Sequence, residues 1–268
     1  MSIEISTQGA VRVLRLTRPD KLNALTRDML EGLRAAMEDV CKTPSVRAVL
    51  LTSSGRAFSV GADLNDPMMG RGLPPEEAQA LTAEVLGGLM NGVIRDLAEC
   101  PVPVVTAVNG IAAGGAVGLS LAGDVTLASE SAVFKLGFVP QLGLVPDLGA
   151  TWQLVRRLGR ARARGYALLG TDLPAADAVS HGLIWATAPD DALEAEAMAV
   201  AERLAAGPSE GQRVTRGLLD LAETADLATS LAAEAQAQAQ CATSLEVDEG
   251  IRAFTERRAP DFTKIPRR

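Results

Sequence analysis

The sequence is short of the residues from which several common catalytic and metal sites are built. It has one histidine, His181, and three cysteines, Cys41, Cys100 and Cys241. His181 lies in a Ser-His-Gly-Leu break after a helical pattern, which predicts a turn or capping role, and no histidine-based triad can form elsewhere. The cysteines are far apart and lack metal-ligand spacing. They indicate reduced thiols in a cytoplasmic protein, and we expect no metal site.

The chain also lacks an excess of positive charge and any targeting signal. Its formal net charge of −7 argues against general nucleic-acid binding. The first four residues lack the basic-then-apolar pattern of a secretory signal. Residues 104–123 carry no charge and are long enough to span a bilayer, but five glycines and Asn109 favour a buried strand, turn and helix. We therefore expect neither a nucleic-acid partner nor a membrane partner.

The basic residues gather near the two ends of the chain. Both groups could meet in space and bind an anionic ligand, although solvated surface charge is the simpler interpretation of any single member. The residues are Arg12, Arg15, Arg18, Lys21 and Arg27 near the start, and Arg252, Arg257, Arg258, Lys264, Arg267 and Arg268 near the end.

Length and hydrophobic patterning predict an α/β protein. The 268 residues, 47% of them apolar, are enough for a large core. Strands are expected within residues 3–17, 46–52, 102–108 and 124–128, a helix capped by Thr26 over 29–40, and another from Pro74 to about 99. This alternation predicts parallel strands joined by right-handed crossovers. Helical periodicity dominates after residue 148, so we predict a core over 1–200 and a helical region over 201–268.

Two loops rich in small residues follow successive strands of the predicted sheet. One lies within residues 53–66 and contains Gly61, and the other spans 109–118 and contains Gly115. Taken alone, the second loop is a tight turn where backbone packs on backbone. Taken together, the two loops would meet at the carboxyl ends of parallel strands. One backbone N–H from each could then stabilise an oxyanion, and such a donor is worth about 3 kcal/mol in a transition state.

The joint occurrence of four spaced motifs gives these loops a more specific interpretation. They are Arg-Pro-x-Lys-x-Asn-Ala-Leu at 18–25, Gly-Arg-Ala-Phe-Ser-x-Gly-Ala-Asp-Leu at 55–64, Asn-Gly-x-Ala-Ala-Gly-Gly at 109–115, and a Phe254…Pro260-x-Phe262 ending. Over nearly its whole length the chain resembles the enoyl-CoA hydratase/isomerase (crotonase) superfamily. The resemblance implies a crotonase-like spiral of ββα turns and a C-terminal helical region that mediates trimers, commonly stacked as hexamers.

The same resemblance implies an acyl-CoA thioester as substrate. The thioester oxygen would be held by the backbone N–H groups of Ala62 and Gly115. Coenzyme A enters as part of the substrate rather than as a bound cofactor, and its phosphates would lie near Lys21 and the basic C-terminal tail. The implied coenzyme A contacts lie in two segments, with Lys21 and Ala24 in the first and Gly61, Asp63 and Leu64 in the second. A loop-ordering role is the simpler interpretation of Asp63.

The side chains expected around the acyl group favour isomerisation over hydration. Hydratases of the family carry glutamates at positions that correspond to Gly118 and, in a looser alignment, Val139. Both are absent here, whereas hydration needs a group to activate water and one to deliver a proton. Asp147, in Gly-Leu-Val-Pro-Asp, would by itself be read as a helix N-cap. Several isomerases of the superfamily place their single catalytic acid there, and Trp152 is close enough in sequence to line the acyl pocket with Gly118 and Val139.

A narrower resemblance supports this assignment. Gly-Leu-Val-Pro-Asp at 143–147, Thr151-Trp152 and Arg160-Ala161-Arg162-Ala163 resemble the ring-1,2-epoxyphenylacetyl-CoA isomerases of bacterial phenylacetate breakdown. We therefore expect an acyl-CoA isomerase that shifts an enoyl double bond or isomerises such an epoxide, with Asp147 as acid and base. Leu144, Val145 and Leu148 would desolvate Asp147 and raise its pKa. The alternatives are an enoyl-CoA hydratase of fatty-acid or aromatic degradation, and a non-catalytic acyl-CoA-binding protein.

Overall fold

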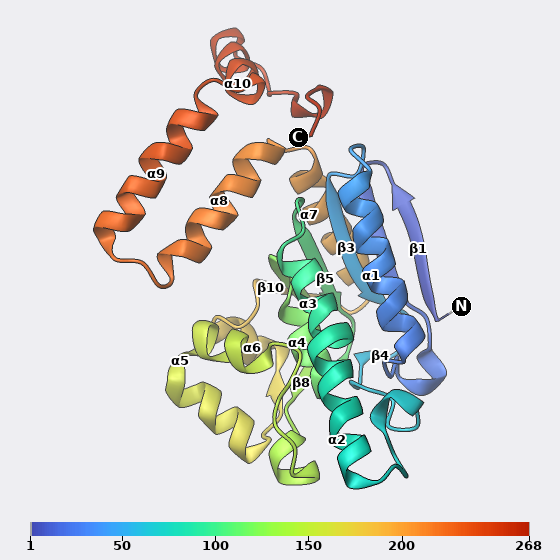
Figure 1. The fold of residues 1–268 in the computed structure, drawn as a ribbon. Helices are drawn as coiled ribbons and strands as arrows, with labels where there is room; N and C mark the ends of the chain where they lie inside the picture. The colour runs from blue at the N-terminus through green and yellow to red at the C-terminus, as the bar shows by residue number, and fades with distance from the viewer. Residues whose placement is uncertain (1, 268) are drawn as a thin grey trace.

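The computed structural model describes residues 2–267 and shows an α/β fold built on two sheets (Figure 1). The larger sheet has the strand order β1-β2-β3-β5-β7-β10, in which only the β1–β2 pair is antiparallel. Its strands are β1 (Ile3–Gln8), β2 (Val11–Leu16), β3 (Ala48–Ser53), β5 (Val104–Val108), β7 (Val125–Ser129) and β10 (Ala186–Ala188). The smaller sheet has the order β4-β6-β8-β9. Its strands are β4 (Ala57–Ser59), β6 (Ile111–Ala113), β8 (Val133–Lys135) and β9 (Leu173–Pro174).

A ββα unit is repeated along the chain. In each unit the first strand (β3, β5 or β7) joins the larger sheet and the next strand (β4, β6 or β8) joins the smaller one. A helical segment then leads back to the larger sheet, and the three units place β4, β6 and β8 side by side and parallel. The predicted spiral of ββα turns is therefore confirmed.

Ten α-helices and five shorter helical segments occur within residues 2–267. The α-helices are α1 (Arg27–Lys42), α2 (Pro75–Glu84), α3 (Asn91–Ala98), α4 (Gly115–Leu121), α5 (Ala150–Leu169), α6 (Ala175–Ser180), α7 (Leu193–Ala205), α8 (Ser209–Ala222), α9 (Leu227–Cys241) and α10 (Leu245–Glu256). The shorter segments are η1 (Pro19–Lys21), η2 (Pro67–Met69), η3 (Val85–Met90), η4 (Phe138–Leu142) and η5 (Phe262–Lys264). Thr26 caps α1 as predicted, because its side chain accepts a hydrogen bond from Met29 N.

Both faces of the larger sheet are buried because its strands alternate their side chains between two cores. Val11 and Val13 of β2 face α7 together with Leu50 of β3. Leu14 and Leu16 of the same strand lie in the other core, with α1, α3 and α4. This arrangement fixes the strand ends, and thus the loops that follow them.

The long periodic segments agree with the sequence prediction, whereas the short strands were missed. The predicted loop over 53–66 contains β4, the glycine-rich stretch over 109–118 contains β6, and β10 interrupts the region predicted to be helical. Each of these strands has only three residues, too few to establish an alternating pattern. Residues 104–123 form β5, β6 and α4, as expected for a buried segment. No helix within the described part of the chain is long and apolar enough to cross a membrane.

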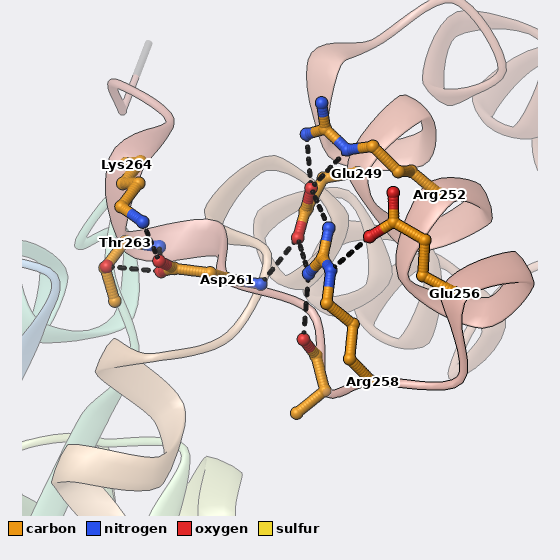
Figure 2. A network of polar contacts seen from close by, with 8 residues as sticks. Glu249, Arg252, Glu256, Arg258, Asp261, Thr263 and Lys264 are labelled. Carbon is orange, nitrogen blue, oxygen red and sulfur yellow. Dashed lines mark hydrogen bonds and ion pairs between the residues drawn. The ribbon is translucent and has the colours of Figure 1, made fainter.

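The helices after α7 extend away from the sheets (Figure 1). Helix α7 begins before the predicted boundary at residue 200 and ends after it, and it packs on the larger sheet through Ala201 and Ala205. Helices α8, α9 and α10 follow α7 in the chain. The boundary between 1–200 and 201–268 stays a prediction. Figure 2 shows how the end of α10 is tied to the tail: buried Glu249 binds Arg252 and Arg258, and accepts a hydrogen bond from Asp261 N.

Candidate active site

A cavity of about 400 Å³ lies where the loop after β4, the start of α4 and the segment from η4 to α5 meet. The loops that the sequence singled out therefore share one cavity with Asp147. The lining residues are Ala24, Val60, Gly61, Ala62, Asp63, Leu64, Met69, Ala113, Gly114, Gly115, Lys135, Gly137, Phe138, Gln141, Leu142, Leu144, Asp147, Gly170 and Asp172.

The loop after β4 is held in place by buried Asn23. The Asn23 side-chain amide donates hydrogen bonds to the carbonyl oxygens of Ser54 and Ala57, and the backbone carbonyl of Asn23 accepts one from Ser59 Oγ. Asn23 adopts a left-handed backbone conformation with φ of 53°, which asparagine tolerates better than most residues. Asn23 belongs to the sequence motif at 18–25, and Ala57 and Ser59 belong to the motif at 55–64. The first motif therefore holds the second in place.

The two small-residue loops lie directly against each other. A Cβ atom added to Gly61 would lie 3.0 Å from Ala113 O and 3.2 Å from Gly115 N, so this approach requires a glycine. The backbone of Leu25 bridges this loop on either side of Ala62. Leu25 N donates a hydrogen bond to Gly61 O, and Leu25 O accepts one from Asp63 N. Within residues 2–267, neither Ala62 N nor Gly115 N donates a backbone hydrogen bond. Both N–H groups are therefore available to an oxyanion at the cavity.

Asp147 brings a desolvated carboxyl group to this place. Its Oδ1 atom is buried and has no hydrogen-bond partner among the described residues. A Cβ added to Gly115 would lie 2.7 Å from that oxygen, so the carboxyl group lies beside the Gly115 backbone. Burial raises the pKa of Asp147 to about 6, although a hydrogen bond from its own backbone N–H opposes the shift. Asp147 is not a helix N-cap, because Gly149 occupies that position of α5.

Gly118, which we expected in the acyl pocket, lies outside the lining of this cavity. It is buried in α4 against the turn that carries Asp147. A Cβ added to Gly118 would lie 2.8 Å from the carbonyl carbon of Leu148, nearer still to Leu148 O, and 3.0 Å from Asp147 O. The space that a larger side chain at position 118 would need is filled by backbone.

Val139 and Trp152 also lie outside the cavity lining. Val139 is in η4, where its neighbour Phe138 lines the cavity instead. Trp152 is 48% exposed and stacks with Arg156, whose guanidinium carbon lies 4.0 Å from the ring centroid. Of the three residues expected to desolvate Asp147, Leu148 is buried and Leu144 lines the cavity, but Val145 is 76% exposed.

Four of the five residues expected to contact coenzyme A line the cavity, namely Ala24, Gly61, Asp63 and Leu64. The fifth, Lys21, is exposed and lies outside the lining. Asp63 is held by a 3.0 Å ion pair with Arg18 and accepts a hydrogen bond from Asn65 N, which lowers its pKa. These contacts order the loop, as the sequence suggested.

Lys21 lies apart from the C-terminal tail, although Arg12 of the first basic group pairs with Asp39, next to the Val40 carbonyl that Arg267 binds. Arg267 donates hydrogen bonds to the carbonyl oxygens of Val40 and Thr43 at the end of α1, whereas Lys21 precedes the start of that helix. The 16 residues of α1 separate the two places by roughly 24 Å. Lys21 and the part of the tail that contains Arg267 therefore lie at opposite ends of α1 within one chain.

Sequence reasoning missed several residues of the cavity wall. Phe138 is buried, and its Cζ would lie 3.6 Å from a Cβ on Gly114, so its ring covers the glycine pair. Gln141 and the 2.5 Å ion pair between Lys135 and Asp172 supply polar groups on the same wall. No local pattern marks them, because η4, β8 and the segment after α5 meet only through the fold. No group of acidic, histidine or cysteine side chains in residues 2–267 could hold a metal ion.

Comparison with known proteins agrees with this geometry. The sequence profile of the family described as enoyl-CoA hydratase/isomerase matches residues 6–265. A "1,2-epoxyphenylacetyl-CoA isomerase" of Escherichia coli (strain K12) is 39% identical over 261 residues, which cover 96% of each chain. A "probable enoyl-CoA hydratase" of Rhodobacter capsulatus is 38% identical over 98% of each chain. An enoyl-CoA hydratase structure from Polaromonas sp. JS666 has a TM-score of 0.90 and 29% identity, covering 97% of this chain and 98% of that one. This chain belongs to the enoyl-CoA hydratase/isomerase family of the crotonase superfamily.

Proposed function

We propose that this enzyme is an acyl-CoA isomerase in which Asp147 is the only acid and base. The observation that carries the proposal is the buried, unpartnered Oδ1 atom of Asp147 beside Gly115. A carboxylate oxygen that has no hydrogen-bond partner can accept a proton from a substrate and return it. A pKa of about 6 keeps the group ionised at neutral pH while making it a stronger base than an exposed aspartate.

The thioester of the substrate would place its carbonyl oxygen between Ala62 N–H and Gly115 N–H. Proton removal from the carbon next to the thioester turns that oxygen into an enolate oxyanion. Two preorganised donors stabilise the enolate more than the neutral thioester, and so lower the barrier. We propose that the coenzyme A portion lies along Ala24, Gly61 and Leu64, which line the same cavity.

With a 3-enoyl-CoA, one carboxyl group completes the reaction. The Asp147 carboxylate removes a proton from C2, and the electron pair of that C–H bond forms the enolate. The Asp147 carboxylic acid then protonates C4, so that the double bond moves from C3–C4 to C2–C3 and Asp147 returns to its ionised form. No proton or electron is gained or lost, and no water takes part.

The local structure supports isomerisation over hydration. Addition of water requires one group to activate it and another to supply a proton. The two positions at which family hydratases carry glutamates hold Gly118, packed against backbone, and Val139 in η4. The 39% identity with the Escherichia coli isomerase also favours an aromatic ring epoxide as a second substrate. The same two N–H groups would stabilise charge on the thioester oxygen as that ring opens.

The test is to incubate the purified protein with a 3-enoyl-CoA, a 2-enoyl-CoA and 1,2-epoxyphenylacetyl-CoA, and to follow the products by mass-resolved chromatography. We expect isomerisation of the 3-enoyl-CoA or the epoxide without added water, and loss of at least about 1,000-fold in kcat for Asp147→Asn. Asp96→Asn is the matched control, because Asp96 pairs with Arg34 outside the cavity and should keep full activity. Hydration that survives Asp147→Asn contradicts the proposal.

We propose that the helices after α7 mediate a homotrimer, alone or as one half of a hexamer. These helices expose apolar side chains that a soluble monomer would bury, among them Leu227, Ile251 and Phe254, which is 84% exposed. Light scattering after size exclusion should give three or six times the 27.9 kDa of one chain. Phe254→Glu should shift the mass toward that of the monomer, and a parent protein that runs as a monomer contradicts this assignment.

A further inference from the structure

The turn that carries Asp147 packs on a bare face of α4. Gly115 and Gly118 are three residues apart, so both lie on the same side of that helix. Leu148 covers this side: its Cδ1 would lie 2.6 Å from a Cβ on Gly115, and its carbonyl carbon 2.8 Å from a Cβ on Gly118. A side chain at position 115 would displace the side chains of Leu148 and Asp147, whereas one at position 118 must push the backbone of the turn away from the helix.

The backbone of the turn is itself held in an uncommon conformation. Leu148 has a φ of 50°, in the left-handed region that a leucine rarely adopts. Such a conformation persists only where surrounding contacts impose it. Here the contacts are the burial of the Leu148 side chain, which is 2% exposed, and the hydrogen bond from Ala150 N to Asp147 O. Ile94 of α3 closes the other side, with its Cγ2 3.4 Å from a Cβ on Gly149.

We propose that Gly118 and Leu148 are positioning residues for Asp147: the bare face at Gly118 admits the Leu148 backbone, and this contact holds the Asp147 carboxyl group beside Gly115. The inference rests on the proposed role of Asp147. It goes beyond that role, because it makes the absence of a side chain at position 118 a condition for the placement of the carboxyl group at position 147. In this backbone a glutamate at 118 and Asp147 in its present place exclude each other.

The carboxyl group of Asp147 faces few other charges, so its titration reports its position. Neither α4 nor η4 contains a charged residue. The charged groups on the cavity wall are Asp63, paired with Arg18, and Lys135, paired with Asp172. Ile94 is the α3 residue that contacts the turn. A displaced turn would expose Asp147 to water, and its pKa would fall toward the ordinary value near 3.8.

The test compares Gly118→Ala with Gly165→Ala. Both replace a glycine inside a helix, but a Cβ at position 165 would meet nothing within 4 Å. For Gly118→Ala we expect kcat to fall about 100-fold, since a carboxyl group displaced by about 1 Å loses that much. We expect KM to change less than about threefold, because the segments proposed to bind coenzyme A do not move. Gly165→Ala should match the parent in both constants.

A second readout separates failure of this inference from failure of the proposed function. The pKa of Asp147 is measured by NMR of the ¹³C-labelled aspartate carboxyl groups, with Asp147→Asn identifying the signal. It should be lower in Gly118→Ala than in the parent and unchanged in Gly165→Ala. This measurement tests the position of Asp147 even if the parent protein isomerises none of the substrates. An unchanged kcat and an unchanged Asp147 pKa in Gly118→Ala overturn the inference.

Two further variants cover the case in which Gly118→Ala does not fold. Leu148→Ala shortens the side chain that covers Gly115 and adds no bulk, so it should lower both kcat and the pKa of Asp147. Gly118→Glu introduces the carboxyl group of a family hydratase and should lose isomerisation without gaining hydration. A Gly118→Glu enzyme that hydrates a 2-enoyl-CoA and keeps the isomerase rate of the parent contradicts mutual exclusion.

Discussion

Replacing Asp147 by asparagine should stabilise the folded protein at neutral pH while it removes the proposed base. Burial raises the pKa of Asp147 from 3.8 to about 6, which means that the fold disfavours the ionised form. One unit of pKa corresponds to 1.36 kcal/mol, so ionising this group in the folded protein costs about 3 kcal/mol more than in the unfolded chain. Asparagine has nearly the same shape and carries no charge.

The sign of the pH dependence follows from the raised folded-state pKa. Between pH 4 and 6 the folded protein binds more protons at this group than the unfolded chain does, so the parent loses stability as pH rises through that window. Below about pH 4 the carboxyl group is protonated in both states. The stability gain of Asp147→Asn should therefore be near zero at pH 4 and reach about 3 kcal/mol at pH 7 and above.

The assay is urea unfolding of the parent and Asp147→Asn at several pH values and one protein concentration, because oligomerisation makes apparent stability concentration-dependent. Asp261→Asn is the control of opposite sign. Its pair with Lys264 lowers the pKa of Asp261 to about 2, so its loss should destabilise the protein by an amount that is constant between pH 5 and 8. An Asp147→Asn protein less stable than the parent at pH 7.5, or a difference that does not change with pH, refutes the reasoning.

Three further predictions concern activity and stability elsewhere. For a 3-enoyl-CoA, kcat/KM should fall about tenfold per pH unit below pH 6, because protonated Asp147 cannot accept a proton; a rate that is flat to pH 4 excludes this base. Arg47→Met should lower the free energy of unfolding by about 2–4 kcal/mol, since buried Arg47 donates to three backbone carbonyls, those of Ala205 at the end of α7, Gly207 after it and Ile265 near the C-terminus. Thr26→Ala should cost about 1 kcal/mol in urea unfolding through loss of the α1 cap, and Thr26→Ser should restore most of it.

The parts of the fold that were predictable from sequence are those with a long local signal. Helix α1 shows a repeating apolar face and a capping threonine, and β3 and β5 are mostly apolar runs between turn signals, buried along their whole length. The strands β4, β6 and β8 were missed because each pairs only with the other two or with β9, far away in sequence. Their pairing is a property of the spiral, and no three-residue stretch reveals it.

The candidate site shows the same division between local and non-local information. The two glycine loops and Asp147 could be proposed from sequence because they lie in motifs shared with a known family, although each taken alone has a simpler interpretation. The residues expected in the acyl pocket lie outside the cavity lining, because the direction of a side chain depends on which face of a helix is buried. Trp152 and Arg156 are four residues apart on the exposed face of α5, while Gln153 and Leu154 face the core. Proximity in sequence to Asp147 therefore does not bring Trp152 into the lining of this cavity.

Burial of a carboxyl group does not by itself identify the base, as Asp124 shows. Burial raises the pKa of Asp124 too, but its carboxylate forms a 2.6 Å ion pair with Arg216 and accepts a hydrogen bond from Val104 N. Those contacts fix Asp124 between α8 and the larger sheet, and a proton taken up there would break them. Asp147 differs because its buried oxygen has no partner within residues 2–267, next to a leucine in a left-handed conformation and two glycines without side chains. Three departures from ordinary stable packing coincide at one place, which is where a strained and reactive group is expected.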